Sequence, residues 1–208
     1  MDVVERASPD TVGIDVGLTS LVALSDGTTE PRPGFTKASE KRLRRLQRAM
    51  ARSKKGTKRR RKRVALVAKC HKNLANQRRD HAHKVSRRIV NRYGRIGVED
   101  LNVKGLAAGM LAKHVNDAAW RQLVSMIDYK AANAGGQVVY VDPRGTSQEC
   151  PECDQVGAVP KTLKDRWHCC DCGAEMDRDV ASAKVVHYRA FGFRARNGRP
   201  ELFCAAAA

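Results

Sequence analysis

Two pairs of closely spaced cysteines constrain the fold of this chain more than any other feature of its sequence. Cys150 and Cys153 form one C-x-x-C motif, Cys169 and Cys172 form a second, and 15 residues separate the two motifs. Each motif directs two thiolates toward one ion from a tight turn, and four thiolates complete a closed tetrahedral shell. The spacing therefore predicts a zinc ribbon whose Zn²⁺ is structural, because no coordination position is left for a catalytic water.

Other assignments of the cysteines are possible but less favourable. Cys170 could replace a ligand of the second motif, but only Cys169 keeps a two-residue gap to Cys172. Two disulfides are disfavoured because residues 1–10 lack the apolar stretch of a secretory signal, which indicates a reducing compartment. Cys70 and Cys204 lie far from both motifs, and we expect them to be free thiols.

Most of the positive charge lies in one segment. Residues 37–95 contain 24 Lys and Arg against two acidic residues, Glu40 and Asp80, a net charge of +22, whereas the whole chain of 208 residues carries +18. Apolar residues at helical spacing on both sides of residues 53–63 indicate two helices joined by a basic turn that faces the phosphates of a polyanion. Residues 53–63 are themselves typical of a loop or a frayed helix, and a solvated, self-repelling arm is the alternative. The candidate nucleic-acid-binding residues are Arg44, Arg45, Arg59, Arg60, Arg61, Lys62, Arg63, Arg78 and Arg79.

The rest of the chain alternates between strand and helix patterns. We expect strands at residues 11–16, 18–24, 28–31 and 95–99, an interior strand at 137–141, and helices at 117–134 and from about 177 onward. Strands that alternate with helices in this order predict an α/β layer fold. No window approaches the roughly 20 apolar residues that a membrane span needs, so we expect no membrane partner.

Three acidic residues stand at the ends of expected elements. Asp15 lies in an otherwise apolar strand, Glu99 ends the strand at 95–99, and Asp179 opens the last helix. Each alone has an ordinary explanation, as a turn residue, a strand-end charge or a helix-start residue favoured by the helix dipole. In a chain with a polyanion-binding segment, the three together predict carboxylates that converge on Mg²⁺ or Mn²⁺. We expect Asp177 to cap the last helix and Asp100 to point to the opposite face from Glu99.

Four motifs carry a resemblance to a known family. GIDVGLTSLVALSDG around Asp15, GVEDLNVKG around Glu99, VDPRGTSQECPEC, and MDRDVASA around Asp179 resemble TnpB, the transposon-encoded RNA-guided nucleases of bacteria and archaea that are related to the type V CRISPR effectors. The resemblance runs from about Val12 to Ala190. It implies an RNase H-like (RuvC) mixed sheet, with a basic helical hairpin insertion and a zinc ribbon inserted before the last acidic motif. It also implies that Asp15, Glu99 and Asp179 are catalytic carboxylates that bind Mg²⁺ or Mn²⁺, that DNA and a guide RNA are the partners, and that no small molecule is the substrate.

The resemblance also predicts how the chain is divided. We expect a first RuvC-like part at residues 1–36, the basic hairpin at 37–95, a second RuvC-like part at 96–145, the zinc ribbon at 146–175, the last RuvC-like helix at 176–192 and a flexible tail at 193–208. The family's N-terminal wedge and recognition lobe have no counterpart in these motifs, so we expect a truncated nuclease half. Ala181 and Val185 stand where members usually have Asn. The expected location is the cytoplasm of a bacterium or archaeon, in association with the nucleoid.

Two other functions fit part of these observations. A weak or inactive zinc-ribbon protein that binds nucleic acid during transposition needs the basic segment and the cysteines but not the three acids. A ribosome-associated zinc protein accounts for the charge and the zinc but not for the helix that begins near Trp120. The three carboxylates favour the nuclease, because the other two hypotheses give them no purpose.

Overall fold

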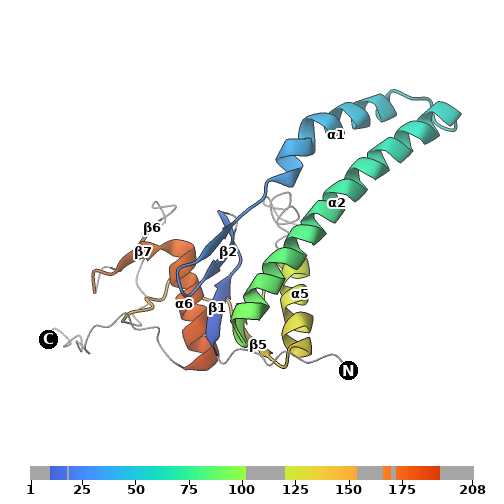
Figure 1. Ribbon diagram of the computed structural model, residues 1–208. Helices are drawn as coiled ribbons and strands as arrows, with labels where there is room; N and C mark the ends of the chain where they lie inside the picture. The colour runs from blue at the N-terminus through green and yellow to red at the C-terminus, as the bar shows by residue number, and fades with distance from the viewer. Residues whose placement is uncertain (1–9, 18, 102–119, 154–165, 170–171, 193–208) are drawn as a thin grey trace, which may run out of the picture.

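A five-stranded mixed sheet forms the centre of the computed structural model, which describes residues 10–17, 19–101, 120–153, 166–169 and 172–192 (Figure 1). Its strands are β1 (Thr11–Asp15), β2 (Ser20–Leu24), β3 (Thr29–Pro31), β4 (Arg95–Glu99) and β5 (Gln137–Val141), and their order across the sheet is β3-β2-β1-β4-β5. Neighbouring strands β1, β2 and β3 pair antiparallel, whereas β1, β4 and β5 run parallel to one another. The expected α/β fold is therefore confirmed.

Helix α6 (Arg178–Phe191) lies against one face of this sheet at very short range. A Cβ atom at Gly13 of β1 would lie 2.1 Å from the carbonyl oxygen of Ala183, and one at Gly97 of β4 would lie 2.8 Å from the Cβ of Ala190. Only glycine allows the helix to approach both strands this closely. The two glycines therefore set the distance between α6 and the strands that carry Asp15 and Glu99.

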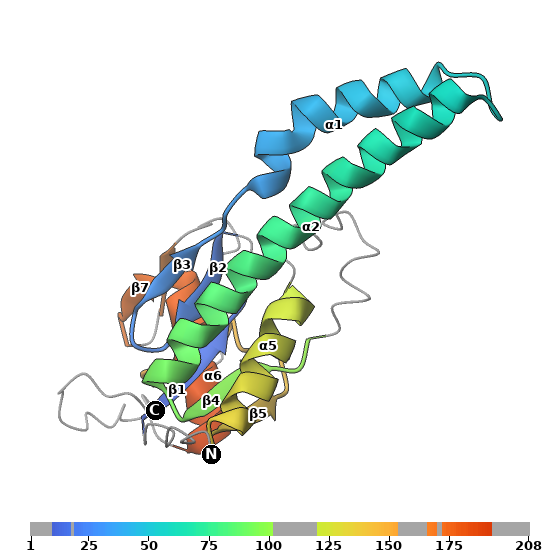
Figure 2. The same cartoon turned by 45° about the vertical axis from the view of Figure 1, so that its right-hand side comes forward.

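The opposite face of the sheet is covered by the second half of α2 (Lys58–Arg92) and by α5 (Trp120–Asn133) (Figure 2). The expected helix at 117–134 is confirmed from Trp120, and its first three residues lie outside the described part of the chain. This apolar layer is the main core of the molecule and excludes water from one side of the sheet. Its members include Val12, Ile14, Val85, Ile89, Ile96, Val98, Leu123 and Ile127.

The basic segment forms the expected helical hairpin. Helix α1 (Phe35–Ala51) and α2 lie side by side and project away from the sheet (Figures 1 and 2). The expectation of a loop or frayed helix across residues 53–63 is wrong for its second part, because α2 begins at Lys58. Thr57 caps this end: its side-chain oxygen accepts a hydrogen bond from the backbone N–H of Arg60 at 3.2 Å, which stabilises a helix start in spite of the surrounding charge.

The expectation of an interior strand at residues 137–141 is also wrong. Strand β5 lies at the edge of the five-stranded sheet, and Tyr140 exposes 48% of its surface. An apolar run by itself does not distinguish a central strand from an edge strand that is covered by a helix, and α5 supplies this cover.

A small hairpin that the sequence did not predict precedes α6. Strands β6 (Arg166–His168) and β7 (Glu175–Asp177) pair antiparallel, and β7 leads directly into α6. The second cysteine motif lies between these strands, so the hairpin belongs to the expected ribbon. Among the helices that the structure describes, none combines the length and the apolar character that crossing a membrane requires.

Candidate metal centres and nucleic-acid surface

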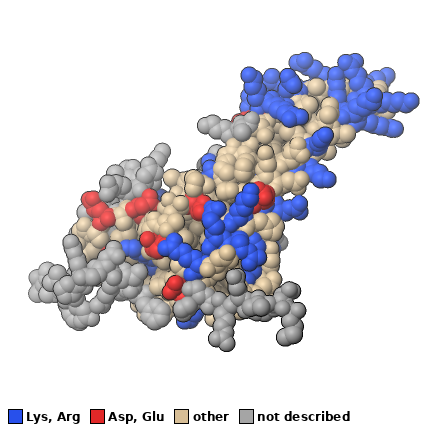
Figure 3. Space-filling model, viewed as in Figure 1, with Lys and Arg blue, Asp and Glu red and all other residues tan. Residues whose placement is uncertain are grey.

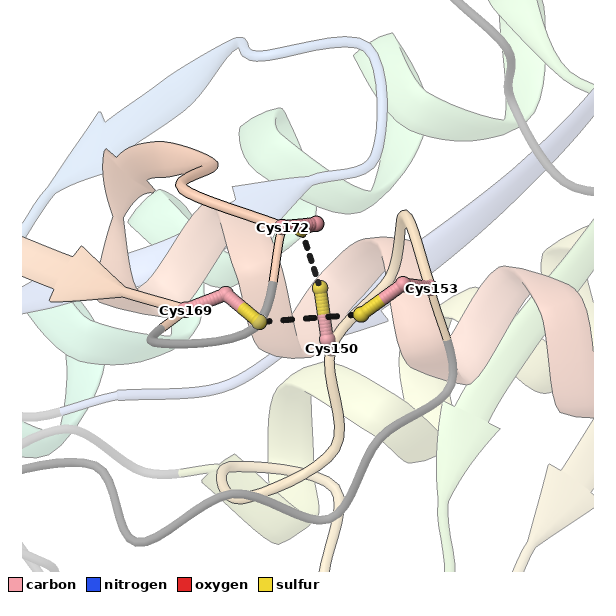
Figure 4. A group of neighbouring side chains, drawn as sticks. All are labelled: Cys150, Cys153, Cys169 and Cys172. Carbon is pink, nitrogen blue, oxygen red and sulfur yellow. Dashed lines mark hydrogen bonds between the residues drawn. The ribbon is translucent and has the colours of Figure 1, made fainter. Parts of the chain in front are cut away.

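The four predicted cysteines converge on one point (Figure 4). The Sγ atoms of Cys150 and Cys172 are 3.7 Å apart, those of Cys153 and Cys169 are 3.6 Å apart, and all four lie within 4.8 Å of one another. A tetrahedral Zn²⁺ with Zn–S bonds of about 2.3 Å requires S···S separations of about 3.8 Å. The thiols are therefore spaced to bind a single ion of this kind, and the alternative ligand Cys170 lies outside the described residues.

Backbone groups shape both cysteine turns. The N–H of Glu152 points at Cys150 Sγ at 3.4 Å, and Gly173, in the left-handed region with φ of 71°, donates its N–H to the carbonyl oxygen of Cys169. Burial raises the pKa of the Cys150 thiol in the absence of a cation. A bound cation would reverse this effect, because it stabilises the thiolate.

Two of the three predicted carboxylates extend from the same edge of the sheet. Asp15 is the last residue of β1 and Glu99 the last of β4, and these strands are adjacent, parallel and in register at the preceding residues. Side chains alternate along a strand, so Asp15 and Glu99 share a face with Gly13 and Gly97, which lie two residues earlier. That face carries α6. The repeated spacing of a glycine two residues before an acid is a further sequence signal for a shared site.

Helix α6 brings the third carboxylate to this edge. Asp177 caps the helix as expected: its Oδ1 accepts hydrogen bonds from the N–H groups of Asp179 and Val180 at 2.9 and 3.1 Å. Asp179 lies in the first turn, and its Oδ2 is 3.0 Å from the position that a Cβ on Gly17 would take. The turn after β1 thus leaves room for the Asp179 carboxylate beside the strand end that carries Asp15.

The electrostatics of this edge follow from burial and like charge. Burial raises the pKa of Asp15 to about 8, and the nearby charges of Glu99 and Asp179 act in the same direction. Burial also raises the pKa of Glu99, against a hydrogen bond from Thr146 and the charge of Arg189, which lower it. The carboxylates are less tightly grouped than the thiols, which form the one set of ligand atoms within 4.8 Å found across the described residues.

A cavity of about 490 Å³ adjoins Glu99 between the end of β4, β5 and α5. Glu99 and Asp100 both border it, together with Trp120, Arg121 and Tyr140. The indole N–H of Trp120 donates to the carbonyl oxygen of Gly17 at 3.1 Å, which fixes the start of α5 beside the strand end of β1. Glu99 is therefore open to a ligand on the side of α5, whereas Asp15 and Asp179 are not among the residues that border this cavity.

The predicted nucleic-acid-binding residues divide into two groups. Lys and Arg side chains gather at the far end of the hairpin (Figure 3). The exposed members of the candidate set are Arg44 and Arg45 of α1, Arg59, Arg61 and Lys62 at the start of α2, and Arg79 farther along α2. Arg60 and Arg63 instead turn toward the end of α1. The guanidinium of Arg60 donates to the carbonyl oxygens of Met50 and Ser53, both at 3.0 Å, and that of Arg63 donates to Ser53 Oγ at 2.6 Å.

Arg78 is half-buried, and Arg44 forms an exposed ion pair with Glu40 at 3.1 Å. An exposed pair of this type is weak, so Arg44 can exchange its partner for a phosphate at little cost. Arg60 and Arg63 are thus engaged within the hairpin, whereas the exposed members of the candidate set are accessible to a polyanion.

Thr146 and Arg189 act on the carboxylate edge, and the sequence analysis did not identify them as site residues. The hydroxyl of Thr146 donates to Glu99 Oε1 at 2.5 Å, and Arg189 lowers the pKa of Glu99 through its charge. Thr146 belongs to the VDPRGTSQECPEC motif, one of the four that carry the family resemblance, and Arg189 carried no signal because it lies in an ordinary helical pattern.

Comparison with family profiles gives two matches. The profile of the family OrfB_IS605, described as "Probable transposase", matches residues 4–109. The profile described as "Cas12f1-like, TNB domain" matches residues 120–186. The two matches divide the chain in front of α5, and the second spans both cysteine motifs.

Individual proteins that are similar in sequence to this chain are described as nucleases of the same kind. A "Putative RNA-guided DNA endonuclease" of Streptomyces pristinaespiralis is 39% identical over 183 residues, which cover 86% of this chain and 45% of the relative. InsQ of Escherichia coli K12, which has the same description, is 31% identical over 215 residues, or 93% of this chain and 53% of the relative. The chain thus spans about half the length of these relatives.

Solved structures share the fold. A Cas12f1–sgRNA–target DNA complex superposes with a TM-score of 0.60 at 14% identity, over 85% of this chain and 49% of the matched chain. A CRISPR-Cas12f ternary complex gives a TM-score of 0.65 at 16% identity, over 88% and 39% of the two chains.

Proposed function

Because the chain belongs to the TnpB family, matched through the OrfB_IS605 profile, we propose that it is a nuclease that hydrolyses DNA phosphodiester bonds with divalent metal ions. The single observation that carries this proposal is the position of Asp15 and Glu99 at adjacent strand ends, with Asp179 brought to the same edge by α6. Any two of these residues are at least 80 positions apart along the chain, so only the fold can place them together.

The sheet supports the more specific proposal of an RNase H-like (RuvC) domain. The resemblance implies an RNase H-like mixed sheet, and the sheet here is mixed, with β1, β2 and β3 antiparallel, β1, β4 and β5 parallel, and the acids on the neighbouring strands β1 and β4. The structural neighbours support the fold by their overall likeness.

The residues at this edge fit a hard divalent cation. Asp15, with a pKa of about 8, holds a proton near neutral pH when no cation is present, because burial disfavours its charged form and the negative charges of Glu99 and Asp179 act in the same direction. Carboxylate oxygens are the ligands that Mg²⁺ and Mn²⁺ prefer. When bound, such ions would activate a water and stabilise the leaving oxygen of a phosphodiester.

The protein's own contribution is to hold these groups in place. Asp15 and Glu99 stand on rigid strands, and Asp179 stands in a capped helix, so the carboxylates keep their spacing without substrate. The exposed end of the α1–α2 hairpin would bind the phosphates of DNA, and of a guide RNA such as the relatives' names imply. The zinc ribbon would hold the start of α6 and take no part in the chemistry.

The test is cleavage of single-stranded and double-stranded DNA by the purified chain with Mg²⁺ or Mn²⁺. D15A, E99Q and D179N should each reduce cleavage by at least about 100-fold and leave DNA binding nearly unchanged, because these acids face the metal ions rather than the phosphates. D100N is the matched control, since it alters the acid next to Glu99. Equal activity in wild type, D15A and E99Q would refute the nuclease, whereas DNA binding without any metal-dependent cleavage would favour the non-enzymatic alternative.

A further inference from the structure

The segment that joins β5 to the first cysteine motif passes directly over Glu99. Within it, Thr146 exposes only 5% of its surface, and its hydroxyl lies 2.5 Å from Glu99 Oε1 and 3.1 Å from the carbonyl oxygen of Pro143. A hydroxyl donates one hydrogen bond, and the short, charge-assisted bond to the carboxylate is the stronger of the two. Thr146 therefore fixes the rotation of the Glu99 carboxylate.

Arg189 holds both ends of this segment. Its Nη1 donates to the carbonyl oxygens of Asp142 and Arg144 at 2.8 and 2.9 Å, and its Nε and Nη2 donate to Glu149 Oε2 at 3.2 and 2.6 Å. One planar guanidinium thus spans the stretch from residue 142 to residue 149. The ammonium group of a lysine lacks this planar arrangement of N–H donors and cannot make the same set of hydrogen bonds.

The segment also connects the two candidate metal centres. It ends at Cys150, and Arg189 belongs to α6, the helix whose first turn carries Asp179. Arg189 is ten residues after Asp179, which corresponds to about 15 Å along the helix. Helix α6 therefore carries Asp179 at its start. Near its end it carries Arg189, which holds the segment that contacts Glu99.

We propose that Thr146 and Arg189 are positioning residues for the metal site: Thr146 orients the Glu99 carboxylate, and Arg189 holds the 142–149 segment that presents Thr146. This inference rests on the proposed function, because it assigns Glu99 to a divalent cation. Groups that orient a metal ligand typically contribute 10–100-fold to metal affinity or activity. Without the hydroxyl, the Glu99 carboxylate can rotate away from the direction in which it must meet a cation.

The experiment is a Mn²⁺ titration of the zinc-loaded full chain, followed by electron paramagnetic resonance, with cleavage measured in parallel. T146V removes the hydroxyl and keeps the side-chain shape, T146S keeps the hydroxyl, and T29V on exposed β3 is the matched control. R189K keeps the positive charge but loses the planar guanidinium, and R189Q removes the charge. Zinc content and thermal unfolding of each variant report whether the ribbon and the core remain intact.

We expect T146V to bind Mn²⁺ about 10-fold more weakly at unchanged zinc content, with T146S and T29V close to wild type. R189K should weaken Mn²⁺ binding about as much as R189Q. Mn²⁺ affinity in T146V equal to wild type would overturn the role of Thr146, and wild-type affinity in R189K would show that Arg189 acts through its charge and not by holding the segment. If wild type itself binds no Mn²⁺ outside the ribbon, the proposed function fails and this inference fails with it; the two failures are therefore distinguished by the wild-type titration.

Discussion

At the scale of single residues, the protonation of Asp15 links the stability of the metal-free protein to pH. Its pKa is about 8 in the folded chain and 3.8 as the ordinary value, so the folded state holds a proton that the unfolded state releases between these limits. Stability falls with rising pH wherever the folded state binds more protons. We therefore expect the melting temperature of the metal-free protein to decrease from about pH 4 to pH 8, with a smaller decrease when Mg²⁺ is added.

The variant that isolates this effect is D15N, which cannot ionise. At pH 8 without metal, D15N should melt several degrees above wild type, since about 1 kcal/mol corresponds to roughly 2–4 °C in a protein of this size. D100N is the control and should follow the wild-type pH dependence. A D15N profile parallel to that of wild type would show that the pH dependence comes from another group.

At the scale of elements, different basic residues of the hairpin are expected to bind phosphates and to stabilise the hairpin itself. Arg59, Arg61 and Lys62 are exposed at the start of α2, whereas Arg60 and Arg63 donate to groups at the end of α1. Each phosphate contact adds about 0.9 to the slope of log affinity against log salt for duplex DNA. We expect the triple variant R59S/R61S/K62S to reduce this slope by about 2 to 3 and to leave thermal stability nearly unchanged.

The matched variant is R60S/R63S, which removes two positive charges from the same first turns of α2. It should lower the melting temperature, because carbonyl oxygens at the end of α1 lose their donors, and it should change the salt slope less than the triple variant. Equal slopes for the triple variant and wild type would place the phosphate-binding surface elsewhere on the molecule.

At the scale of the whole molecule, α6 couples the ribbon to the sheet. Ala181 packs against Cys150 and Cys169 on the ribbon side, and Lys184 pairs with Glu152 at 3.4 Å. The other side of the helix lies on β1 and β4. Ala181, at a position where the family resemblance implies Asn, thus has a packing role in this chain. We expect loss of zinc to loosen β6, β7 and the first turn of α6 first and to weaken Mn²⁺ binding at the carboxylates, because Asp179 lies in that turn.

Hydrogen exchange of C150S/C153S is the measurement, since these changes remove half of the zinc ligands without a chelator that would also remove Mg²⁺. Exchange should increase in β7 and the first turn of α6, while β1 and β4 remain protected in the apolar core. C70A, which alters a cysteine of α2 outside the cluster, should keep its zinc. Unchanged exchange at residues 178–182 in the double variant would show that the two centres are independent.

The local features of this protein were predictable from the sequence because they depend on neighbours in the chain. The C-x-x-C spacing, the cap at Asp177, the two helices of the basic hairpin and the short strands were all expected, and the structure confirms them. The expected domain boundaries remain predictions. The expectation of a loop or frayed helix was wrong for residues 58–63, because their helical state depends on the cap at Thr57 and on the contact with α1.

Features that depend on distant segments were decided only by the tertiary structure. The order of the strands places β5 at the edge, and it places Asp15 beside Glu99, which no periodicity reveals. The raised pKa of Asp15 arises from burial and from charges that follow it by 84 and 164 residues. The hydrogen bond from Thr146 to Glu99 also joins residues that are distant along the chain, and so do the hydrogen bonds by which Arg189 holds the 142–149 segment. The sequence determined which groups are present and how they are spaced locally, whereas the packing of α6 on glycine-containing strands decided which of them meet, because burial and electrostatic interaction depend on distance in space.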